Sequence, residues 1–188
     1  MTSVPDPARS PDPSGAGEPD GTLEATATGG VIRFERHLRH PVDEVWAAVT
    51  EPARIADWWL PFPAAITVDL RPGGLMVMSA IGGEPMTITC EVLRVEPPVL
   101  LEHTHVDPGS RVLWELEPES GGCTLRLSHF VTDPVTAIDN CYLVGLHTSL
   151  ERLAPALAGT PIPWDDDTFT RHQRRYAAAG LAAEPPVA

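Results

Sequence analysis

The sequence predicts an α+β fold in which a curved antiparallel sheet of about seven strands wraps around a long C-terminal helix. Two observations lead to this fold class. Residues 66–132 hold a series of strand-like segments separated by compact turn signals, and residues 135–157 carry one continuous apolar helical stripe. Turns this short join only antiparallel neighbours, because a parallel crossover needs a dozen or more residues. We therefore expect a meander, with two short helices after its first strand.

The first 29 residues are expected to form a disordered tail. They are rich in Pro, Gly, Ser and Asp and hold almost no large apolar side chain. Such a segment cannot bury enough surface to offset the entropy of ordering. The folded domain is predicted to span residues 30–160. It begins with a strand at residues 31–38, where Ile32 and Phe34 lie on one face.

Two short helices are predicted after this strand. Apolar residues recur at helical spacing along residues 42–49, and Pro41 suits the first helical position. Pro52 starts a second helix, which ends near the tryptophan pair Trp58 and Trp59. Six strand candidates follow, each bounded by Gly and Pro turn signals. They are residues 66–70, 75–81, 86–95, 99–106, 111–117 and 123–132.

The last large element is predicted to be one helix over residues 135–157. At 1.5 Å per residue it spans on the order of 34 Å, enough to cross the concave face of the sheet. Gly159 is expected to end it, and residues 161–188 are expected to form a C-terminal extension with a short amphipathic helix and a frayed end. The apolar stripe of the long helix consists of Ile138, Tyr142, Leu146, Leu150, Leu153 and Leu157.

Composition excludes several functional classes. The formal net charge of -13 argues against a nucleic-acid partner and an anionic membrane surface, because both attract clustered basic residues. Cys90, Cys123 and Cys141 are widely spaced in apolar segments, which favours buried reduced thiols over disulfides or a zinc framework. The sequence has no signal-peptide pattern and no apolar run long enough for a membrane helix. A cytoplasmic protein is therefore expected.

Five short phrases stand in order along the chain, at residues 40–46, 50–59, 69–74, 114–118 and 145–153. In this order and spacing the chain resembles the SRPBCC superfamily of START and polyketide cyclase-like proteins. Within it, the chain is most similar to the branch related to the activator of heat-shock-protein ATPase. The resemblance spans residues 31–176. It implies a helix-grip fold with a cavity between sheet and long helix.

The resemblance also implies a range of functions. Superfamily members hold lipids, hormones, polyketide intermediates or aromatic compounds in the cavity, and some catalyse cyclisation or dehydration there. Members of the heat-shock branch act on a chaperone through their outer surface. Because one fold hosts unrelated activities, the function must be argued from the site.

Large or adaptable apolar side chains stand where the wall of such a cavity is expected. Met is pliable and suits an irregular pocket, although packing in the core explains such residues as well. Trp58 or Trp59 is expected at the rim. The apolar candidates for ligand binding are Trp58, Trp59, Met76, Met78, Trp114, Phe130, Tyr142 and Leu146.

Histidines supply the polar candidates. His103 and His105 stand two apart on one strand, so both side chains point to the same face and count as ligand-binding candidates. Imidazole titrates near neutrality, which makes His103, His129 and His147 the candidate catalytic residues. A metal site needs at least three ligands, and the spacing guarantees no third, so neither a metal nor another cofactor is predicted. Glu102 alternates with His103 and is expected to face solvent.

The sequence therefore predicts a protein that binds a small, mostly apolar molecule in the cavity. A cyclase-like or dehydratase-like enzyme that uses cavity histidines is one alternative. A module that binds a protein partner, as the chaperone activator does, is another. Whether the chain is an enzyme, which ligand it takes and its oligomeric state stay open.

Overall fold

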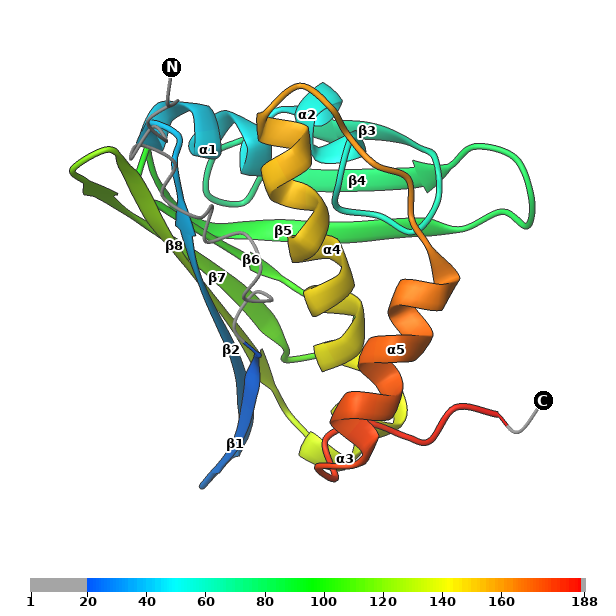
Figure 1. Cartoon of the computed structure of the whole chain (residues 1–188). Coiled ribbons are helices and arrows are strands. Elements are labelled where there is room, and N and C mark those ends of the chain that lie inside the picture. The colour runs from blue at the N-terminus through cyan, green and yellow to red at the C-terminus, as the bar shows by residue number, and fades with distance from the viewer. Residues whose placement is uncertain (1–19, 187–188) are drawn as a thin grey trace, which may run out of the picture.

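Helix α4 (Tyr142–Leu157) lies across the concave face of an eight-stranded antiparallel sheet in the computed structural model, which describes residues 20–186 (Figure 1). The predicted α+β class is confirmed, with one strand more than expected. The strands are β1 (Thr22–Thr26), β2 (Gly29–Leu38), β3 (Ala64–Val68), β4 (Leu75–Ala80), β5 (Thr87–Glu96), β6 (Leu100–Thr104), β7 (Arg111–Glu119) and β8 (Gly122–Val131).

The sheet order is β1-β2-β8-β7-β6-β5-β4-β3. The strands from β3 to β8 each pair with their neighbours in sequence, which confirms the predicted meander. The first predicted strand, β2, pairs with the last, β8. The apolar stripe of α4 is buried where the helix crosses the concave face of the sheet. Burial of this stripe drives the helix onto the sheet.

Strand β1 corrects the predicted extent of the disordered tail. It pairs with β2 from Thr22 opposite Arg33 to Thr26 opposite Gly29, and most of its side chains are exposed. Just before it, the backbone N–H of Gly21 donates to the hydroxyl of Tyr176 at 2.9 Å. Backbone pairing supports this strand more than apolar burial does, so composition did not reveal it. Residues 1–19 of the expected tail lie outside the described residues.

The two short helices are confirmed as α1 (Val42–Thr50) and α2 (Pro52–Ala56). Pro41 stands at the N-cap of α1, one residue before the predicted position. The chain then turns into the core, where the Trp58 indole N–H donates to the carbonyl of Ala48 at 3.0 Å. This bond fixes the segment after α2 against α1.

The single helix predicted over residues 135–157 is wrong, because the structure has two helices there. Helix α3 (Pro134–Asp139) ends at Asn140, and α4 starts after Cys141, whose φ of 54° is left-handed. This conformation costs a non-glycine residue about 1–2 kcal/mol. The freed carbonyl of Ile138 accepts from the N–H groups of Cys141 at 3.0 Å and Ala183 at 3.2 Å. No Gly or Pro stands at the break, and the apolar helical pattern continues across it. The sequence therefore predicted one helix.

Helix α5 (Asp166–Ala177) folds back alongside α4, as predicted for the C-terminal extension (Figure 1). The Asp165 carboxylate caps it by accepting the N–H of Thr168 at 2.9 Å. Its buried side chains are His172, Gln173 and Tyr176, and Arg174 and Arg175 lie in its last turn. Within residues 20–186, no helix has both the length and the apolar character needed to cross a bilayer.

Candidate functional site

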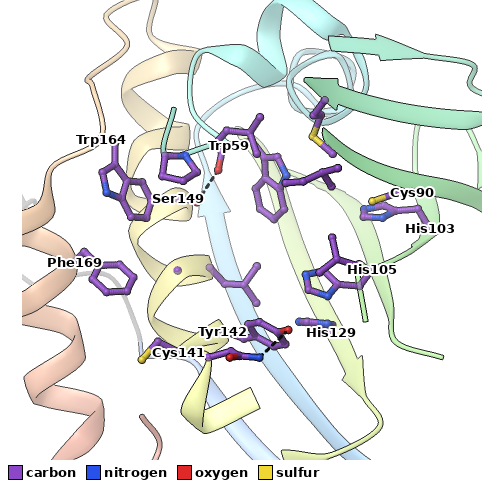
Figure 2. A pocket seen from close by; sticks show the side chains of 18 residues that line it. Trp59, Cys90, His103, His105, His129, Cys141, Tyr142, Ser149, Trp164 and Phe169 are labelled. Carbon is purple, nitrogen blue, oxygen red and sulfur yellow. Dashed lines mark hydrogen bonds between the residues drawn. The ribbon is translucent and has the colours of Figure 1, made fainter. Parts of the chain in front are cut away.

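A cavity of about 350 Å³ lies between the inner face of the sheet and α4 (Figure 2). Its size is within the range of small-molecule sites, which begins near about 300 Å³. The strand wall consists of Met78, Ile88, Cys90, His103, His105 and His129, and the helix wall consists of Tyr142, Gly145, Leu146 and Ser149. The remaining lining residues are Leu60, Pro61, Val106, Asn140 and Cys141, together with the aromatic residues Trp59, Trp164 and Phe169, which we call the mouth.

The register of the sheet sets the positions of the histidines. His103 on β6 pairs with Val112 on β7, and Val112 pairs with His129 on β8. Directly paired residues point to the same face, so His103 and His129 both point inward, two strands apart. His105 lies two residues beyond His103 and also lines the cavity. The predicted common face of His103 and His105 is confirmed. Glu102 lies on the other face, where it pairs with Arg111 at 2.6 Å.

His103 is fully engaged by protein groups. Its Nδ1 donates to the carbonyl of Thr104 at 2.8 Å, and its Nε2 accepts from the Trp114 indole N–H at 3.2 Å. These two bonds fix the neutral tautomer with the proton on Nδ1. Burial lowers the pKa of His103 to about 4. His103 therefore offers its ring face to the cavity, with no nitrogen left for a ligand.

His129 lines the cavity with a buried ring whose two nitrogens have no hydrogen-bond partner among the described residues. The ring centre lies 4.3 Å from that of His105, whose Nδ1 also lacks a partner in the same described region. Burial, followed by the neighbouring His105 and His103, lowers the pKa of His129 to about 3. A neutral imidazole with both nitrogens open donates one hydrogen bond and accepts another.

Tyr142 belongs to the helix wall of the cavity and lies close to His105 and His129. Its ring lies 5.1 Å from that of His105 and 5.5 Å from that of His129. The Tyr142 hydroxyl donates to the carboxylate of Asp107 and accepts from Asn140 Nδ2. Burial and the bond to Asp107 raise the pKa of Tyr142, so the phenol stays protonated at neutral pH. Tyr142 thus presents an aromatic surface whose polar end is already satisfied.

A buried arginine of α4 holds the mouth of the cavity in place. The Arg152 guanidinium donates to the carbonyls of Trp58 at 2.7 Å, Leu60 at 2.8 Å and Ile162 at 3.0 Å. The Ser149 hydroxyl adds a bond of 2.8 Å to the carbonyl of Trp59. Both segments that carry the mouth residues Trp59 and Trp164 are therefore tied to the same helix.

Two residues of the mouth were missed by the sequence analysis. Trp164 and Phe169 come from the C-terminal extension, and their rings lie 5.7 Å apart (Figure 2). The extension was expected to fold back, but its contact partner on the body could not be deduced from sequence spacing. The only available signal was a pair of large aromatic side chains in an otherwise acidic segment. Their presence makes the extension part of the cavity wall.

Several predicted ligand-binding residues lie in the core. Trp58, Met76 and Trp114 surround a gap of about 20 Å³ beneath Trp59, which is too small for an organic ligand. The rings of Trp58 and Trp114 each meet Trp59 edge to face at 5.3 Å. These three residues support Trp59 from below and have no place in the cavity lining.

Phe130 and His147, which were predicted to contribute to the cavity, do not line it. Phe130 alternates with His129 and therefore points to the outer face of the sheet, where the Arg111 guanidinium lies 3.8 Å from the centre of its ring. His147 lies on the side of α4 that faces Phe34 and α5, away from the cavity. One residue along a helix turns a side chain by about 100°, which separates His147 from the cavity residue Leu146.

The chain matches one known protein family and is similar to several solved structures. A sequence model of the family described as Activator of Hsp90 ATPase homolog 1-like protein matches residues 39–158. Among solved structures, CalU16 from Micromonospora echinospora is 28% identical with a TM-score of 0.65, over 85% of this chain and 96% of that chain. NE0264 from Nitrosomonas europaea is 26% identical with a TM-score of 0.59, over 69% and 94%. CV1439 from Chromobacterium violaceum is 26% identical with a TM-score of 0.56, over 70% and 97%. None of the curated proteins matches the chain.

Proposed function

Because the chain belongs to the Activator of Hsp90 ATPase homolog 1-like family, within the SRPBCC superfamily, we propose that it binds a small, mostly apolar ligand in its cavity. The observation that carries this proposal is the cavity itself. About 350 Å³ of space is bordered mainly by apolar and aromatic side chains, and His129, whose buried ring nitrogens have no hydrogen-bond partner within residues 20–186, is one of the lining residues. An apolar pocket with few convergent polar groups is typical of a ligand site.

The polar groups of the wall narrow the class of ligand. His103, Tyr142 and Ser149 already form hydrogen bonds within the protein, whereas both ring nitrogens of His129 and Nδ1 of His105 have no partner among the described residues. A buried donor or acceptor without a partner costs about 1–3 kcal/mol, and a ligand hydroxyl or carbonyl would remove that cost. We expect an aromatic or alicyclic compound with one such oxygen directed at His129.

Catalysis by the cavity histidines has weaker support. His129 and His105 are close enough to share a substrate, with ring centres 4.3 Å apart. A group with a pKa of about 3 is, however, a weak base near neutral pH. No carboxylate is seen to orient His129, since its nitrogens have no partner among the described residues. A cyclase-like or dehydratase-like role would need bound substrate to raise this pKa toward neutrality.

The family description also raises a chaperone-activator role exerted through the outer surface. A grip filled by side chains would favour that role, whereas a cavity of about 350 Å³ favours a ligand.

We also propose a cytoplasmic location. The three cysteines are free thiols and two of them are buried, and thiols stay reduced in the cytoplasm.

Fluorescence titration with N-phenyl-1-naphthylamine, a neutral apolar aromatic probe, tests the binding proposal. We expect saturable binding of one probe per chain, with energy transfer from the tryptophans at the mouth. Leu146→Glu places a carboxylate in the apolar wall and should weaken binding at least about tenfold. The matched control Leu93→Glu changes an exposed leucine of β5 and should bind like the parent. Equal loss in both variants, or no saturable binding by the parent, would contradict the proposal.

A further inference from the structure

A second group of titratable side chains lies on the opposite side of α4 from the cavity. His147 and Glu151 stand one helical turn apart on α4, and His172 faces them from α5. The two imidazole rings stack with centres 4.2 Å apart and planes 18° from parallel. His147 Nε2 lies 3.7 Å from Glu151 Oε1, and His172 Nε2 lies 3.1 Å from Glu151 Oε2. Both Nε2 atoms thus face the same carboxylate.

Within residues 20–186, His147 Nε2 and His172 Nδ1 are buried without a hydrogen-bond partner. His172 Nε2 is close to the Glu151 carboxylate, at 3.1 Å, but is not aligned for a hydrogen bond with it. The two histidines are 0% and 2% exposed, whereas the side chain of Glu151 is 28% exposed. Buried polar groups without a partner are rare in folded proteins, and each needs an explanation. The partly exposed carboxylate of Glu151 connects the group to solvent, so an ion could reach it.

Two imidazoles and one carboxylate form a donor set that divalent transition metals favour. One ligand atom from each residue lies within 4.8 Å of the other two, so small side-chain rotations would bring all three onto one ion. We infer that His147, Glu151 and His172 form a site for a divalent transition-metal ion, and that Zn²⁺ with one bound water is the occupant their donors suit best. The strand histidines considered in the sequence analysis do not take part in it.

The surroundings prepare His147 for this role. The Tyr176 hydroxyl lies 2.7 Å from His147 Nδ1 and also accepts the N–H of Gly21. A proton on Nδ1 donated to Tyr176 leaves Nε2 free to bind an ion, which is the usual outer-sphere arrangement of a metal-bound histidine.

The charges around the site are mixed. Asp20 Oδ1 lies 3.8 Å from His147 Nδ1 and is paired with Arg175, while Arg36 lies near enough to affect the His147 pKa. Asp20 and Glu151 therefore offset the two nearby guanidinium groups, and an ion would not meet a net positive field. His172 and Tyr176 lie beyond residues 39–158, so the site joins the family region to the C-terminal extension. A bound ion would clamp α5 onto α4.

Metal titration of the full chain tests this inference. After chelator treatment and dialysis, we expect one Zn²⁺ per chain by calorimetry and by elemental mass spectrometry, and a rise of several degrees in Tm. Mg²⁺ prefers oxygen ligands and should give no rise. Co²⁺ should give visible absorption of a four- or five-coordinate ion. Failure of Zn²⁺ to bind the folded chain would overturn the inference.

Two conservative variants and two controls locate the ion. Glu151→Gln and His172→Gln keep side-chain size and should weaken Zn²⁺ binding about 100-fold or more, with circular dichroism confirming that each folds. His40→Gln alters the pair of His40 and Glu44, 3.0 Å apart, to which the described residues add no third ligand, and this variant should bind Zn²⁺ like the parent. If His129→Gln abolished binding while His172→Gln did not, the ion would belong to the cavity and the inference would be wrong.

Discussion

Gly145 offers a direct way to fill the cavity without disturbing the fold. It lies in α4 on the cavity wall, and a Cβ built there meets no atom within 4 Å. Alanine should therefore fit, and because Gly is about 1 kcal/mol worse than Ala inside a helix, Gly145→Ala should raise Tm by about 2–4 °C. Leucine and phenylalanine at the same position project into the space that a ligand would occupy.

The assay combines thermal unfolding with probe titration across the series Gly145→Ala, Gly145→Leu and Gly145→Phe. Affinity for N-phenyl-1-naphthylamine should fall as the side chain grows, and it should fall at least about 100-fold with phenylalanine, or about 3 kcal/mol. All three variants should keep the parent circular dichroism spectrum, because the cavity has room for them. A Gly145→Phe variant that folds and binds the probe as tightly as the parent would refute the location of the site.

Three further outcomes follow from the structure. His103 and His129, with pKa values of about 4 and about 3 when folded, protonate near 6.5 when unfolded. Their stabilising effect is complete above that pH and is lost as pH falls, by about 2 kcal/mol each at pH 5, because the unfolded chain binds more protons. Urea unfolding at pH 7 and pH 5 measures this loss, and a flat profile would contradict it. Arg152→Leu removes three hydrogen bonds to backbone carbonyls, two of them buried, and should destabilise the protein by about 3 kcal/mol or more in the same assay, whereas a loss below about 1 kcal/mol would show that the mouth does not depend on it. Burial raises the pKa of Cys90 to about 11, so Ellman's reagent should label Cys141 first, and a fast phase that survives Cys141→Ser would count against the described burial.

The sequence predicted the parts of the fold that follow from local patterns. Short turns with Gly and Pro between alternating segments predicted the meander, and strand alternation placed His103 and His105 on one face. The break at Cys141 was missed because a left-handed cysteine carries no sequence signal. Strand β1 was missed because backbone pairing, which composition does not record, holds it in place.

The lining residues of the cavity were predictable only where strand alternation or helical spacing determines which face a side chain occupies. Met78, Tyr142 and Leu146 line the cavity as expected, and Trp59 lies at its mouth. The sequence did not separate Trp59, at the mouth, from Trp58, in the core, because adjacent residues share the same composition and pattern. It also gave His103 a chemical role, whereas Trp114 and a backbone carbonyl occupy both of its nitrogens.

The pairing of distant elements accounts for the remaining differences. His147 and His172 are 25 positions apart and meet only because α5 folds against α4. Trp164 and Phe169 reach the cavity for the same reason. Tertiary contacts between helices depend on which faces meet, and a hydrophobic pattern alone leaves several choices.

Native mass spectrometry of the protein isolated from its own organism tests the central claim most directly. Proposed binding in the cavity of about 350 Å³ predicts a population carrying one small apolar molecule per chain, which denaturation releases for identification. The Gly145→Phe variant, isolated in the same way, should carry none. Recovery of only the bare chain, together with no rise in Tm across a library of aromatic and lipid compounds, would contradict the claim that the cavity is a ligand site.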